Sequence, residues 1–130
     1  MIFDIFGNPN GELKYLPTYE FKCEEQIAIK KIIIEWNGSS QRFLGLISSD
    51  LVDRNETNPR QQLCTFIKRD DSAMTDVEFT SPVFYDIQKQ YLHEATISID
   101  SIFNRKIPDI KNIYIQLLAS KQGMSAVSIY

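Results

Sequence analysis

The sequence predicts an all-β protein, a single antiparallel β-sandwich of jelly-roll or Greek-key type with about eight strands. Three observations predict it. Short segments that alternate apolar and polar residues recur along the chain, turn residues separate them, and no helical segments come between them. In residues 95–100, Ala95, Ile97 and Ile99 share one face of a strand and polar residues share the other. One buried face and one solvent face are typical of a sandwich.

Four such segments fill the second half of the chain. They are residues 63–67, 77–80, 95–100 and 112–118. A long polar loop at 48–60 precedes the first of them, and a second polar loop at 69–76 separates the first from the next. Loops beyond about 12 residues in compact domains tend to be functional or mobile. One helical turn is expected within 86–93.

The first half of the chain predicts four strands. Residues 2–6 form a short first strand, and the alternation in residues 19–23 indicates a second. The third is the isoleucine-rich segment 27–36. Asn37-Gly38 is a strong hairpin signal and predicts a tight connection from this segment to a strand at 42–47.

The apolar residues of segment 27–36 change parity near Lys30 and Lys31. A one-residue slip turns every following side chain to the other face, so we expect a bulge or a strand break there. A helix over 24–31 is the alternative, because two glutamates stand at its start. The isoleucine-rich end favours the strand.

Length and charge limit the classes of protein. A chain of 130 residues with 43% hydrophobic residues fits one domain with a core that needs no disulfide or metal. We expect residues 1–119 to form the sandwich and residues 120–130 a C-terminal tail. The 14 basic and 17 acidic residues give a net charge of −3, and no basic run exceeds two residues. Because phosphate neutralisation supplies most of the affinity for nucleic acid, the sequence predicts no dedicated nucleic-acid surface.

The N-terminal residues predict no secretory signal peptide, because Asp4 interrupts the apolar start and no basic leader precedes it. The longest purely apolar run, 32–34, is too short to span a bilayer. We therefore expect a protein made in soluble form in the cytoplasm, with no membrane partner. In that reducing compartment Cys23 and Cys64 are expected to be buried thiols.

The sequence carries no catalytic signature. His93 is the only histidine, and no nucleophile motif surrounds any residue that could pair with it. One histidine and two distant cysteines do not supply the four ligands of a zinc site. We expect no enzyme activity, no cofactor and no metal site. The acidic loop residues are expected to be solvated, and calcium binding by their carboxylates is a minor alternative. These residues are Asp50, Asp53, Glu56, Asp70, Asp71 and Asp76.

Two features predict an interaction surface. Trp36 and the tyrosines belong to types enriched at carbohydrate platforms and protein interfaces, although most are expected in the core. In the tail, the apolar residues of 127–130 alternate, and such a segment either adds as a strand to a neighbouring subunit or closes its own sheet. Both alternatives stay open. The candidate interface residues are Val127, Ile129 and Tyr130 of the tail and Asp53, Arg54 and Asn55 of the long loop.

The second half of the chain resembles a known family. The segments that carry the resemblance are 46–52, 62–67, 79–87, 95–100 and 113–118, with a polar insertion after the first. Their order is similar to that of the jelly-roll capsid-type domains of polinton-like transposons, virophages and related eukaryotic DNA viruses. The resemblance covers residues 44–118 and consists of strands and turn residues, without a catalytic motif.

The resemblance implies a structural protein of the virion. The implied role is that of a capsid, minor capsid or spike protein, which self-assembles or docks to other coat subunits. A homo-oligomer, other coat proteins and a host receptor are then the expected partners, and the virion is the expected location. The alternative is a freestanding β-sandwich binding module for a glycan or a protein partner.

Overall fold

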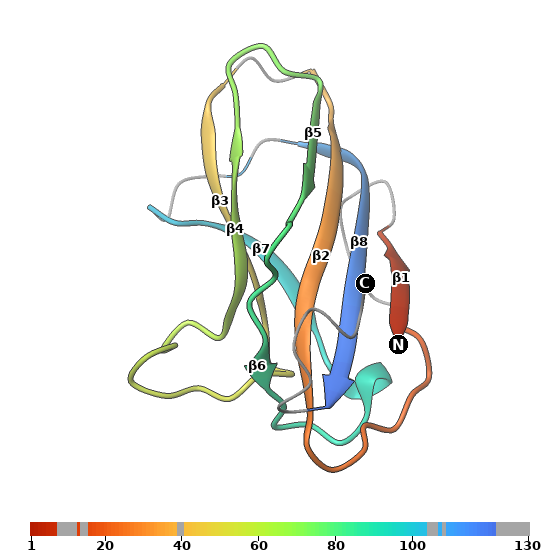
Figure 1. Cartoon of the computed structure of the whole chain (residues 1–130). Coiled ribbons are helices and arrows are strands. Elements are labelled where there is room, and N and C mark those ends of the chain that lie inside the picture. Colours follow the sequence, from red (N-terminus) through yellow and green to blue (C-terminus); the bar gives the residue numbers. More distant parts are fainter. Residues whose placement is uncertain (8–12, 14–15, 39–40, 104–106, 108, 122–130) are drawn as a thin grey trace.

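Two antiparallel β-sheets packed face to face make up this protein in a computed structural model (Figure 1). The structure describes residues 1–7, 13, 16–38, 41–103, 107 and 109–121. Its elements are β1 (Ile2–Phe6), β2 (Glu25–Trp36), β3 (Phe43–Ser49), β4 (Gln62–Lys68), β5 (Met74–Glu78), β6 (Tyr85–Asp86), a 3-10 helix (Leu92–Glu94), β7 (Ile97–Ser101) and β8 (Ile110–Lys121). The predicted all-β sandwich is confirmed.

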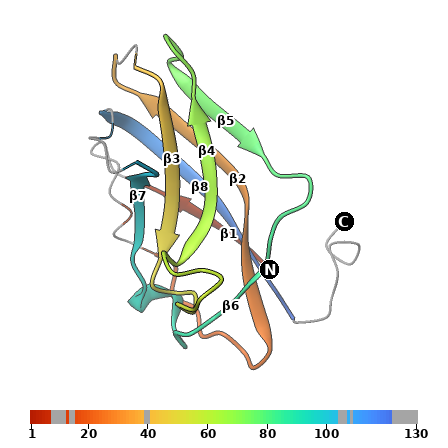
Figure 2. The same cartoon turned by 90° about the vertical axis from the view of Figure 1, so that its left-hand side faces the viewer.

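The order of the strands is that of a jelly roll. The larger sheet has the order β1-β8-β2-β5, with β6 also paired to β2, and the smaller sheet has the order β4-β3-β7. Leu13 forms an isolated antiparallel bridge with Ile97 of β7 and takes the second place in the chain order. When β6 is taken with β5 and the Leu13 bridge is placed beside β7, the sheets read β1-β8-β2-β5/β6 and β4-β3-β7-Leu13, the arrangement of two Greek keys. In Figure 2 the smaller sheet lies in front of the larger one.

The core is centred on the long antiparallel pair of β2 and β8. Inward side chains of both strands are buried and pack against residues of the smaller sheet such as Phe43, Ile47 and Phe66. The pairing with β8 shifts register between Ile29 and Lys31, which confirms the predicted bulge. Segment 24–31 is therefore not a helix, because the apolar side chains that follow the bulge need a strand to reach the core.

The hairpin predicted at Asn37-Gly38 is wrong. Gly38 does adopt a positive φ of 70°, as a tight turn requires. The strands on its two sides nevertheless belong to different sheets, since β2 pairs with β8 on one edge and with β5 and β6 on the other. Both edges of β2 are occupied, so β3 crosses to the second sheet. The local turn signal is thus correct, and the pairing inferred from it is not.

The predicted strand at 19–23 is also absent from the described residues. Only Glu20 makes an isolated bridge there, to Tyr91. The segment ends in a turn in which the backbone N–H of Lys22 donates to the Glu25 carboxylate at 2.6 Å. The predicted helical turn within 86–93 appears as the 3-10 helix at 92–94, displaced toward the C-terminal side. At 19–23, short alternation did not distinguish an extended loop from a strand, and at 86–93 the helical spacing of Ile87 and Tyr91 did not locate the turn.

The predicted division of the chain at residue 119 falls inside a strand. β8 continues to Lys121, which pairs with Glu25 of β2. The candidate interface residues Val127, Ile129 and Tyr130 lie outside the described residues. Within the described part of the chain, no helix is long and apolar enough to cross a membrane.

Gly45 and Phe66 form a cross-strand pair that joins β3 to β4. The Phe66 ring lies over the glycine, so a Cβ atom built at position 45 would come within 2.1 Å of the ring. A glycine inside a strand often marks such a close approach. The pair allows the aromatic ring to lie across the neighbouring strand and fill the core.

We expect Gly45→Ala to lower the free energy of unfolding by about 1–3 kcal/mol, because the new methyl group overpacks the core. Adding Phe66→Leu should make the double variant less unstable than the sum of the two single changes. Urea unfolding followed by tryptophan fluorescence measures both. Gly38→Ala is the control. A Cβ atom at position 38 meets no atom within 4 Å, so the change costs only the strain of the positive φ. Its effect on the free energy of unfolding should add to that of Phe66→Leu. Additivity at position 45 would contradict the assigned contact.

Candidate binding groove

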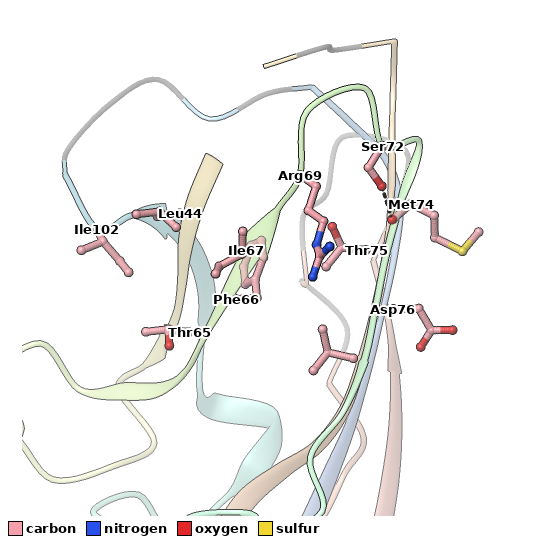
Figure 3. Close-up of a pocket in the computed structure, with 11 residues that line it drawn as sticks. Leu44, Thr65, Phe66, Ile67, Arg69, Ser72, Met74, Thr75, Asp76 and Ile102 are labelled. Carbon is pink, nitrogen blue, oxygen red and sulfur yellow. Dashed lines mark hydrogen bonds between the residues drawn. The ribbon is translucent and has the colours of Figure 1, made fainter. Parts of the chain in front are cut away.

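An open groove of about 600 Å³ lies where the free edges of the two sheets face each other (Figure 3). One side is β4, which pairs only with β3 among the described residues. The other side is β5, which pairs with β2 and with no other described strand. Each strand therefore has one edge of backbone N–H and C=O groups that is not used by a sheet. Such an edge can accept a further strand.

Apolar side chains are exposed along this groove. Ile67 of β4 and Met74 of β5 are each 51% exposed. Ile67 stands on the outer face of the smaller sheet opposite Leu44, and the partly buried Ile102 continues the lining beyond it. Edge strands usually carry charges, proline or bulges that discourage pairing with other chains. The exposed face of β4 presents Thr65 and Ile67, which give no such protection.

Arg69 supplies the positive charge of the groove. It follows β4, and its side chain points into the space between β4 and β5 (Figure 3). Its guanidinium makes no hydrogen bond or ion pair with any described residue, whereas the Asp76 carboxylate points away from the gap. A guanidinium has five N–H donors and stacks on aromatic rings. The groove thus offers donors for a carbonyl or carboxylate group and a planar cation for a ring.

An aromatic cluster forms the floor behind β4. The Phe66 ring centre lies 6.1 Å from that of Phe43 and 6.2 Å from that of Trp36. The indole N–H of Trp36 donates to the Thr75 hydroxyl of β5 at 2.8 Å. This hydrogen bond ties the core under β4 directly to β5. The two sides of the groove are therefore held in place before any ligand binds.

Lys68 anchors the end of β4, next to Arg69. Its side chain is fully buried, and its ammonium donates to the carbonyl oxygens of Gln41 at 3.0 Å and Arg69 at 3.2 Å. The same ammonium lies 5.9 Å from the centre of the Trp36 ring. A buried charge is tolerated only with such partners. Lys68 thereby fixes the turn that carries Arg69.

The predicted interface residues of the long loop lie away from the groove, beyond the opposite end of β4. The Asn55 side-chain carbonyl accepts hydrogen bonds from the backbone N–H groups of Thr57 and Asn58 at 3.0 and 2.8 Å. Arg54 donates to the Gln61 side chain at 3.4 Å, and the backbone N–H of Asp53 donates to the Asp86 carbonyl at 3.2 Å. The structure gives Asn55 a local role in the turn and does not bring these residues to the groove.

The acidic loop residues do not form a metal-binding group in the described part of the chain. Asp50 instead joins three segments. It forms an ion pair of 2.9 Å with Lys89 and accepts a hydrogen bond of 2.8 Å from the backbone N–H of Thr96.

His93 is exposed, with its ring centre 5.4 Å from that of Tyr91. Trp36 is only 3% exposed, so it is unavailable as a carbohydrate platform.

The two cysteines differ, and the expectation of two buried thiols is wrong for Cys23. Cys23 is exposed because it lies in the turn before β2. Cys64 lies in β4 and is largely buried, and this burial raises the pKa of its thiol to about 12.

The sequence did not predict the groove, because residues far apart in the chain determine which strands pair with each other. The nearest signal was Ile67, an apolar residue on the polar face of a predicted strand.

We expect stability to fall with rising pH between about 9 and 12, partly because of Cys64. The unfolded thiol ionises near pH 8.5, whereas the folded pKa is about 12. The unfolded state then binds fewer protons in this window, so the free energy of unfolding decreases as pH rises. Cys64→Ala should make this slope shallower by up to about 1.4 kcal/mol per pH unit. Urea unfolding at several pH values measures it. The exposed Cys23→Ala is the control, and equal slopes in all three proteins would contradict the assignment.

Comparison with family models, curated proteins and solved structures finds no match to this chain. The function is therefore inferred from the residues of the groove and from the fold.

Proposed function

We propose that this protein is a structural subunit of coat type, which acts by docking to copies of itself or to other coat subunits. The observation that carries the proposal is the groove between β4 and β5, with its unprotected strand edge and exposed apolar side chains. A surface of this kind is suited to contact with another protein chain, because a strand edge supplies backbone hydrogen bonds and the side chains supply apolar area.

The fold supports the proposal in a weaker way. Jelly rolls occur in viral capsid proteins and also in lectins and other families. A fold of this kind is compatible with the resemblance found in residues 44–118 and does not by itself select a function. The groove favours a protein partner among these possibilities, because it combines a free strand edge with exposed apolar side chains.

A second exposed apolar edge is consistent with assembly. β1 is the other edge of the larger sheet, and its outward residues Ile2 and Phe6 are 55% and 69% exposed. The free edges at β1 and at β4 and β5 are different surfaces. Contacts between different surfaces on neighbouring copies produce rings when the rotation closes and open chains when it does not. A repeated assembly therefore fits this distribution of edges.

The alternative function is that of a freestanding binding module for a glycan or a protein. Arg69 favours this alternative, because its guanidinium has no partner among the described residues and offers donors to a ligand. Among the residues that line the groove, the only aromatic side chain is the buried Phe66. Sugar-binding sites use exposed ring faces, so the groove favours a protein partner over a glycan.

Light scattering of the full chain tests self-assembly. We expect a mass well above the 15.1 kDa of one chain. Ile67→Lys should shift the protein toward the single-chain mass, because a charged side chain on the edge opposes strand pairing. Val83→Lys is the matched control, since Val83 is also β-branched and is 61% exposed away from the groove. A single-chain mass for the unmodified protein at millimolar concentration would refute self-assembly and favour the binding module.

A further inference from the structure

We propose that the groove binds an extended segment of a partner protein, which adds as a strand to the free edge of β4 and pairs an acidic side chain with Arg69. The inference rests on the proposed function and specifies the chemistry of the docking partner. Three features of the described residues support it: the direction of the backbone groups on the two facing edges, the exposed side chain of Ile67 and the position of the Arg69 guanidinium.

The free edge of β4 presents backbone groups in the pattern of a strand. The backbone N–H of Ile102 donates to the Leu44 carbonyl at 3.1 Å, so Leu44 directs its backbone groups toward the side of β7. Ile67 pairs with Leu44 in the register of β3 and β4. Because alternate residues of an antiparallel strand bond to opposite sides, Ile67 and Thr65 direct their N–H and C=O groups away from β3. Two such residues lie about 7 Å apart, a spacing that the backbone of another extended chain matches.

β5 faces this edge with the same kind of groups. The backbone N–H of Trp36 donates to the Ala73 carbonyl at 2.9 Å, so the odd-numbered residues of this segment bond to β2. Met74 and Asp76 therefore direct their backbone groups to the other side. The groove thus offers backbone donors and acceptors along both of its sides, and an extended peptide is the ligand with a matching row of such groups.

Charge complementarity selects an acidic segment. The Arg69 side chain points into the space between β4 and β5 (Figure 3) and has no partner among the described residues. Three aspartates are close to it in sequence, but none forms an ion pair with it. The Asp76 carboxylate points away from the gap, and Asp70 and Asp71 are exposed in the turn after β4. Because a guanidinium can pair with a carboxylate through two parallel hydrogen bonds, a carboxylate on the bound segment would complete the site.

The spacing of Ile67 and Arg69 predicts where the acidic residue stands in the bound segment. Both residues line the groove, and they lie two positions apart in the chain. Residues two apart share one face of a strand, so a matching strand carries its acidic residue two positions from an apolar one. The apolar residue would cover Ile67, which is exposed, and the acidic residue would reach Arg69. The proposed ligand is therefore an extended segment in which one residue separates an apolar residue from an acidic one.

Synthetic peptides added to the full-length protein test the proposal. Capped six-residue peptides alternate valine and threonine, starting with valine, and carry glutamate in place of the first or the fifth residue to cover both strand directions. At least one should bind at millimolar concentration or below and slow amide hydrogen exchange at Thr65 and Ile67. Glutamine for glutamate in the peptide, or Arg69→Gln in the protein, should each weaken binding about three- to tenfold. Both changes together should weaken it no further, and high salt should remove the advantage of glutamate.

Arg54→Gln is the matched control, because Arg54 is also an exposed arginine but is not part of the groove lining. It should leave the preference for glutamate unchanged. Arg69 contributes its backbone carbonyl to the contact with Lys68, so Arg69→Gln should keep the folded circular dichroism signal. A peptide with glutamate on the threonine face should bind no better than its glutamine counterpart.

The outcomes separate this inference from the proposed function. If the unmodified protein assembles but no peptide binds, the inference is overturned and assembly uses another surface. If the protein stays a single chain and a glutamate peptide binds through Arg69, self-assembly fails and the inference stands. Binding without a preference for glutamate, or with one that Arg69→Gln leaves unchanged, would overturn it. So would slow exchange at Thr65 and Ile67 in the free protein that Val127→Asp and Ile129→Asp make fast, because the chain's own C-terminal residues would then be the occupant.

Discussion

The pairing of β2 with β8 is the interaction on which the rest of the structure depends. Each strand has twelve residues, and every other strand of the larger sheet attaches to one of the two. Their inward isoleucine and leucine residues form the wall against which the smaller sheet packs. Burial of one such side chain contributes about 1.5–3 kcal/mol, so this pair supplies much of the driving force for folding. β3 must cross to the second sheet because β2 has no free edge.

The sequence predicted what depends on local alternation. Alternation of apolar and polar residues predicted the sandwich and most of its strands. A change of parity in the apolar residues predicted the bulge beside Lys30. The sequence failed at Asn37-Gly38, where the turn forms but the pairing is decided by β8, which is far away in the chain. The groove was missed for the same reason. β4 and β5 were recognised as neighbours in sequence, but nothing local shows that they belong to different sheets.

The groove is a consequence of how the two sheets are joined. Trp36 connects the core under β4 to Thr75 of β5 by a hydrogen bond, and Lys68 fixes the turn that carries Arg69. The two edges are thus held apart at a fixed spacing instead of collapsing together. A preformed site loses less conformational entropy on binding, so a short segment can bind with useful affinity. This argument links the buried polar contacts of the core to the proposed docking function.

On the edge of β2 that faces away from β8, the pairing partner changes near Lys30. Below it β2 pairs with β6, and above it β2 pairs with β5. The backbone N–H of Phe79 donates to the Lys30 carbonyl at 2.8 Å, so the chain leaves the sheet at this point. That edge of the larger sheet is divided into strands of five and two residues, too short to template uncontrolled aggregation. β4 keeps seven continuous residues. Among the described strands with a free edge, β4 is therefore the longest, and it is one of the two that line the groove.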